Sequence, residues 1–97
     1  MATVDLHHLW AAVRRDFDLA RMLLPNPPAE AEGSAARLTD WLDHNELELA
    51  LDELEALGEE NAAPPAYWEH LRSAAERMEL PVHVARLSRR AAGSTEL

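Results

Sequence analysis

Residues 46–57 read ELELALDELEAL. Apolar side chains recur there at steps of three and four, which is the spacing of one face of an α-helix. The members of this face are Leu47, Ala50, Leu54 and Leu57, with Leu51 at its edge. Across the whole chain β-branched residues are very few, so no strand is expected. The stretch therefore predicts a central amphipathic helix in an all-α fold.

The sequence on either side has the same helical spacing, interrupted by prolines. Thr3 and Ser34 are candidate N-cap residues, Pro64-Pro65 suits a helix start, and Pro81 is expected to stop or kink the fourth helix. The expected helices span about residues 3–24, 34–44, 46–57, 64–80 and 82–90. These predict a bundle of four to five short helices in one domain covering residues 1–97, with a proline-rich loop at 25–33 and a frayed tail at 91–97.

Three further local features lead to expectations about helix ends and the core. Asn45 followed by Glu48 matches a capping box, which starts a new helix, although one continuous helix over 34–57 is an open alternative. Gly58 is a good residue to end the helix, because glycine accepts a left-handed conformation. Trp10 and Trp41 are expected in the core.

Composition excludes several classes of function. The chain has no cysteine, so disulfides and thiol chemistry are excluded. A net charge of −9 disfavours nucleic acid and anionic membranes as partners. The N-terminal sequence does not resemble a signal peptide and no apolar run is long enough to span a bilayer, so the expected location is the cytoplasm.

The charge is concentrated rather than scattered. Between Leu38 and Leu71 there are ten acidic residues and no lysine or arginine, and all nine basic residues of the chain are arginines elsewhere. On a helix, Glu48, Asp52, Glu55 and Glu59 form one acidic stripe opposite the apolar face. The sharper hypothesis is a surface that binds a basic protein, with Leu49 and Tyr67 as apolar anchors. The plainer one is a solubilising face with arginines from the first or the last helix crossing nearby.

Residues for catalysis or cofactor binding are lacking in the expected patterns. The five histidines form no pair at the spacing that puts two metal ligands on one helix face. No serine sits in a nucleophile elbow, and no glycine-rich phosphate loop is present. We therefore expect no enzyme activity, no catalytic residue, no metal and no cofactor.

Two segments resemble a known family. The first is His44-Asn45-Glu46-Leu47-Glu48-Leu49-Ala50-Leu51-Asp52-Glu53-Leu54; the second is Pro64-Pro65-Ala66-Tyr67-Trp68-Glu69-His70-Leu71, followed by Ala74-Ala75-Glu76-Arg77-Met78. Together, over residues 38–80, they are similar to the small helical immunity proteins of bacterial polymorphic toxin systems, of the MafI-like kind. The resemblance implies tight binding to a toxin made by the same cell. Many such toxins are nucleases with a basic groove.

The leading hypothesis is thus a non-catalytic immunity protein that neutralises a cognate toxin by covering its basic active site. One alternative is a self-associating adaptor or accessory subunit, a homodimer joined through Leu49, Leu51 and Tyr67. Another is an acidic regulator that mimics nucleic acid and acts on a DNA-binding protein.

Overall fold

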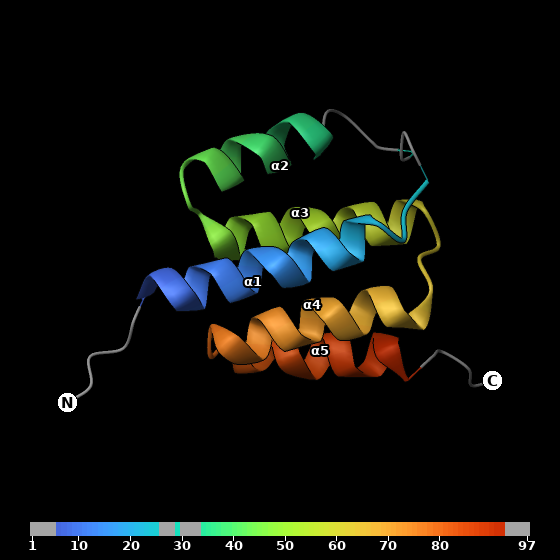
Figure 1. Ribbon diagram of the computed structural model, residues 1–97. Coiled ribbons are helices and arrows are strands. Elements are labelled where there is room, and N and C mark those ends of the chain that lie inside the picture. The colour runs from blue at the N-terminus through green and yellow to red at the C-terminus, as the bar shows by residue number, and fades with distance from the viewer. Residues whose placement is uncertain (1–5, 26–28, 30–33, 93–97) are drawn as a thin grey trace.

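Five α-helices make up the structure, and the residues it describes contain no strand. The computed structural model describes residues 6–25, 29 and 34–92. The helices are α1 (Leu6–Arg21), α2 (Ser34–Asp43), α3 (Leu47–Glu60), α4 (Pro65–Arg77) and α5 (Pro81–Ala91) (Figure 1). The all-α expectation is confirmed. The expectations for Thr3, for most of the loop 25–33 and for the tail beyond residue 92 lie outside the described residues.

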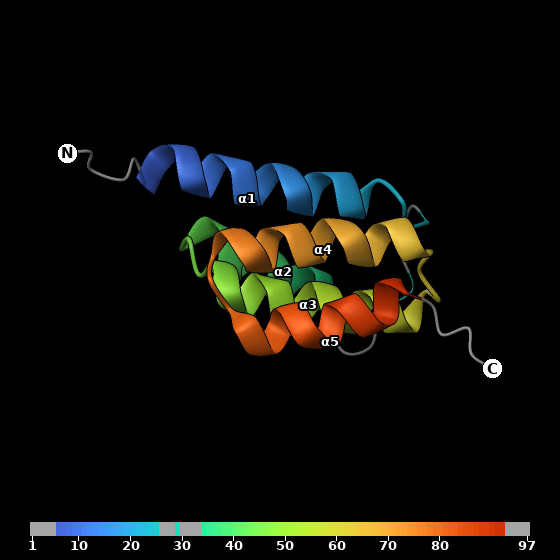
Figure 2. The same cartoon turned by 90° about the horizontal axis from the view of Figure 1, so that it is seen from below.

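Successive helices run in opposite directions, so α1, α3 and α5 point one way and α2 and α4 the other (Figure 1). α2 packs on α3, and α4 packs on α5, as expected for helices joined by short turns. α1 packs mainly against α4, which is distant in sequence. Seen from below, α1 is the outer layer on one side of α4 (Figure 2). One face of α1 is therefore left to solvent.

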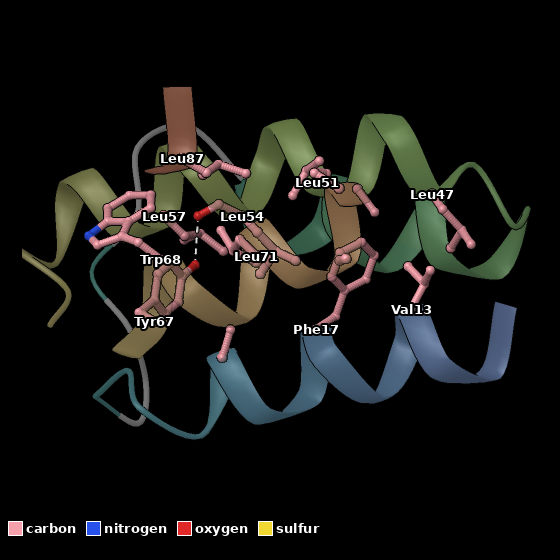
Figure 3. Packing of buried hydrophobic residues seen from close by; sticks show 14 of the residues in the cluster. Val13, Phe17, Leu47, Leu51, Leu54, Leu57, Tyr67, Trp68, Leu71 and Leu87 are labelled. Carbon is pink, nitrogen blue, oxygen red and sulfur yellow. Dashed lines mark hydrogen bonds between the residues drawn. The ribbon is translucent and has the colours of Figure 1, made fainter. Parts of the chain in front are cut away.

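The core lies between α1, α3 and α4 and is closed by α5 (Figure 3). The apolar face predicted for residues 46–57 is confirmed, because its members are all buried. Trp10 and Trp41 lie at the margin of the core and are only partly buried. A salt bridge of 2.9 Å between Asp16 and Arg77 ties α1 to α4 beside this core. The larger buried side chains are Val13, Phe17, Leu38, Leu47, Leu51, Leu54, Leu57, Tyr67, Trp68, Leu71 and Leu87.

The question of one helix or two over residues 34–57 is settled by a break at Asn45. Its φ is 56°, in the left-handed region that asparagine tolerates better than most residues. The Arg14 guanidinium, which comes from α1, donates to the carbonyl of Leu42 and to the Asn45 side chain. The expected capping box does not form, since Glu46 is the N-cap of α3 and makes no side-chain cap bond. The Asn45 side chain accepts from Arg14 instead.

Gly58 does not end the central helix as expected, because α3 continues to Glu60. A methyl group at this position would lie 2.5 Å from the Tyr67 ring and 2.6 Å from the Trp68 ring. Glycine is needed there so that α4 can bring its two aromatic rings against α3. The helix ends at Asn61, whose side chain bonds to the carbonyl of Leu57 and to both backbone polar groups of Ala29.

Both later helices begin at a proline, which was predicted for α4, whereas Pro81 was expected to end the fourth helix and instead starts the fifth. Pro65 opens α4 and Pro81 opens α5, each within the first turn. Proline has no N–H to donate, and the first turn of a helix has no partner for one. Within the described parts of the chain, every helix is too short or too polar to cross a bilayer.

Candidate protein-binding surface

The predicted acidic stripe faces another helix of the same molecule. His83 Nε2 lies 2.9 Å from Asp52 Oδ1, and Arg86 donates two hydrogen bonds of 2.9 and 2.8 Å to the two carboxylate oxygens of Glu55. Arg90 pairs with Glu59. Each pair joins residues 31 apart in sequence. We call the three pairs Asp52–His83, Glu55–Arg86 and Glu59–Arg90 the α3–α5 ladder.

The constant offset follows from the topology of the bundle. α3 and α5 are parallel because α4 returns the chain between them (Figure 1). Two parallel helices keep a fixed register, so acids at steps of three and four on one meet bases at steps of three and four on the other. Within the described residues, the backbones of α3 and α5 are not in close contact. Long side chains therefore bridge the gap between them.

The middle rung of the ladder is the strongest. The Glu55 side chain is only 12% exposed, and its two oxygens accept from one planar guanidinium. Such paired, charge-assisted hydrogen bonds are stronger than single neutral ones. They also raise the pKa of Arg86 above its ordinary value, with hydrogen bonding to Glu55 as the main cause. In the two outer pairs the carboxylates of Asp52 and Glu59 are half exposed, so these pairs contribute less to the stability of the fold.

The ladder corrects the expectation that the stripe is an open acidic surface. Its helical periodicity is right, but three of its four carboxylates already have partners within the molecule. Reversing the charge of Glu55 is therefore expected to disturb the fold. The missed signal lay in residues 83–90, where the basic side chains of His83, Arg86 and Arg90 repeat the spacing of the acids Asp52, Glu55 and Glu59.

The two predicted anchors have different positions. Leu49 is 40% exposed on the outer side of α3 and remains available to a partner. Tyr67 is fully buried, and its hydroxyl donates a 2.6 Å hydrogen bond to the carbonyl of Leu54 (Figure 3). Burial raises the pKa of Tyr67 well above its usual value. Tyr67 is thus a core residue and not a surface anchor. Leu51 is also fully buried, so a dimer through Leu49, Leu51 and Tyr67 lacks the necessary surface.

A second group of acids lies around the turn between α2 and α3. Asp40, Asp43, Glu46 and Glu48 are exposed, and no salt bridge joins their carboxylates to another described residue. Leu49 follows directly on Glu48 at the start of α3. We call this group the corner patch: Asp40, Asp43, Glu46 and Glu48.

The two helix ends at this turn have opposite electrostatic effects on the acids of the corner patch. Glu48 is in the first turn of α3, where the positive end of the helix dipole favours an acid. Asp40 and Asp43 are in the last turn of α2, where the dipole disfavours them, and that turn has no basic residue of its own. The nearby Arg14 binds the carbonyl of Leu42 and the Asn45 side chain. The positions of Asp40 and Asp43 are therefore not explained by the stability of the fold.

One group of potential metal ligands was not foreseen from the sequence. Asp52, Glu55 and His83 bring their donor atoms within 4.8 Å of one another. Each of these side chains already has a partner in the α3–α5 ladder, so a cation would have to compete with Arg86 for Glu55. The group is well explained as part of the ladder.

The remaining acidic surface can attract and orient a positively charged macromolecule. It offers exposed carboxylates next to an exposed leucine, the combination of a polar rim and an apolar contact found at protein interfaces. Comparison of the chain with family models, with curated proteins and with solved structures gives no match.

Proposed function

We propose that this chain is a non-catalytic binding protein whose partner is a protein with a basic surface. In the most specific form of the proposal it is an immunity protein of the cytoplasm, which binds a toxin made by the same cell and covers the toxin's active site. The resemblance of residues 38–80 to MafI-like immunity proteins supports this form. The net charge of −9 supports the choice of a basic partner.

The corner patch is the observation that carries the proposal. Asp40 and Asp43 lie at the unfavourable end of α2 and lack an ion-pair partner among the described residues. Charges that cost stability are commonly kept where they bind something, because functional sites are selected for binding and not for stability. Leu49, next to the patch, supplies the apolar contact.

The corner patch replaces most of the stripe as the proposed contact. Glu48 belongs to both groups and stays in the proposal. Asp52 and Glu59 are half exposed despite their partners and so can add to the local negative potential. Glu55 is mostly covered and acts in the fold. The electrostatic centre of the interface is thus expected at the α2–α3 turn.

Fast association is the physical advantage of this arrangement. Complementary charge raises association rates to about 10⁸–10⁹ M⁻¹s⁻¹ at low salt, compared with about 10⁵–10⁶ M⁻¹s⁻¹ without it. A cell that makes a toxin benefits from rapid capture of any free copy. Covering an active site requires no chemistry from the inhibitor.

Growth rescue tests the proposal. The protein encoded immediately upstream of this chain, the candidate toxin, is expressed in a bacterial host, with and without the chain. Growth should stop with the toxin domain alone and resume when the chain is present. A neighbouring product that is harmless, or a toxin that still kills in the presence of the folded chain, would reject the immunity role.

The contribution of the corner patch is measured with a double charge reversal, Asp40→Lys with Asp43→Lys. We expect its association rate with the toxin domain to fall at least about tenfold at low salt, because the attraction becomes repulsion. The matched control is Glu60→Lys with Glu69→Lys, which makes the same change in net charge at two exposed acids that have no salt bridge to a described residue. Equal rates for the double variant and the control would show that the partner binds elsewhere.

A further inference from the structure

Exposed apolar side chains are concentrated at the C-terminal end of α1. Among the described residues, five large apolar side chains are exposed, and three of them are Leu19, Met22 and Leu23. Met22 is the most exposed of the five, at 78%. Its N–H donates to the carbonyl of Asp18, so helical geometry continues one residue past Arg21. Met22 therefore extends the outer surface of α1.

The neighbouring positions on the same face are small or charged. With 100° per residue, Ala11, Arg15, Asp18 and Met22 lie on the side of α1 opposite the buried Val13, Phe17 and Ala20. Ala11 is a small residue that lets another helix approach closely. Arg15 and Asp18 are exposed and form no salt bridge to another described residue.

This face is complementary to itself in one antiparallel arrangement. If two copies of α1 are paired so that residue numbers across the contact add to 33, Arg15 of one copy faces Asp18 of the other. In the same register Ala11 faces Met22, which places a large exposed apolar side chain over a small one. Twofold symmetry repeats both pairings, as in any isologous contact. A single register thus satisfies the charges and the shapes together.

The charge of the molecule also favours this face for self-association. Two copies with a net charge of −9 repel each other. α1 has three arginines and two aspartates, whereas α3 has six acids and no base. Contact through α1 brings the copies together at a surface that is not acidic, while the corner patch lies on other helices.

We propose that two copies of this chain form an antiparallel dimer through the outer faces of α1. The proposal is independent of the toxin partner and uses different residues from the dimer expected from sequence. In this register the two helices overlap from Ala11 to Met22, a contact about 18 Å long and smaller than a standard interface, so the dimer forms in a concentration-dependent way, with a Kd on the order of 10–100 µM.

Sedimentation equilibrium of the full chain, over about 5–500 µM in about 0.15 M salt, tests the proposal. We expect a monomer–dimer equilibrium that Met22→Glu weakens at least about tenfold, since the change occurs in both copies. The matched control is Val82→Glu, which changes an apolar residue of similar exposure, 70%, on α5. A wild-type chain that stays monomeric throughout, or equal weakening by both variants, would overturn the proposal.

Charge exchange and cysteine trapping test the register. Arg15→Glu and Asp18→Arg should each weaken the dimer, and the two changes combined should restore it. The chain has no cysteine of its own, so Ala11→Cys with Met22→Cys should give a dimer linked between positions 11 and 22 under oxidation. These positions are about 16 Å apart within one helix and cannot bond there. Failure of both the rescue and the 11–22 link would overturn the antiparallel register.

Discussion

The acid-rich segment of this chain divides into two regions that differ in whether their carboxylates have partners within the molecule. In the α3–α5 ladder, Asp52, Glu55 and Glu59 have partners on a parallel helix. In the corner patch, Asp40, Asp43, Glu46 and Glu48 are exposed without a salt bridge to any described residue. The same residue types thus have ion-pair partners in one region and stay exposed without them in the other. Local sequence does not separate the two cases, because the difference lies in what α5 places opposite.

The largest effect is expected from Glu55→Lys, which opposes a new cation to Arg86 at the covered rung of the ladder. Two positive charges would share a site that is mostly shielded from water, so the free energy of unfolding should fall by about 2–3 kcal/mol. Urea denaturation followed by circular dichroism measures this fall. Adding Arg86→Glu should recover part of the loss. If Glu55→Lys is no worse than Glu48→Lys, the ladder does not stabilise the fold.

A smaller effect is expected from Arg90→Met at the last rung. Arg90 pairs with Glu59, and its guanidinium lies 4.7 Å from the centre of the Trp68 ring, so two interactions are lost. Both are partly exposed, and the expected loss of stability is about 1 kcal/mol. Arg89→Met is the matched control, because Arg89 is exposed and has no salt bridge to a described residue. Thermal melts of the two variants should differ by a few degrees; identical melts would contradict the assignment.

The smallest effect on stability, with the opposite sign, is expected from Asp40→Lys with Asp43→Lys. Cations at the end of α2 agree with the helix dipole, and mutual repulsion within the corner patch is relieved. The free energy of unfolding should therefore rise by about 0.5 kcal/mol while binding of a basic partner weakens. A marked loss of stability in this variant would mean that the corner patch serves the fold after all.

Several features could be read correctly from local pattern. The apolar face of residues 46–57 is buried, and α4 begins at Pro65, because each depends only on helix geometry or on the chemistry of proline. The acidic stripe has the predicted periodicity for the same reason. The partners of the stripe could not be predicted from local sequence, because they depend on the register between α3 and a helix about 30 residues later.

Two local signals were overridden by distant residues. Gly58 has the chemistry of a helix end, yet it lies inside α3 because Tyr67 and Trp68 need the space that a side chain would fill. Asn45 has the chemistry of an N-cap, yet its side chain accepts a hydrogen bond from Arg14 of α1. In both cases the competing partner comes from another helix and is invisible in a window of a few residues.

Sequence alone determined that this chain forms short amphipathic helices, where most of them begin, and that negative charge is concentrated around the third. These properties follow from side-chain periodicity and backbone chemistry within one turn of a helix. Only the tertiary structure decided which carboxylates are neutralised, which aromatic residue is buried and which face of α1 stays open. The physical reason is that burial and ion pairing require two surfaces, and the second surface is chosen by how the helices pack.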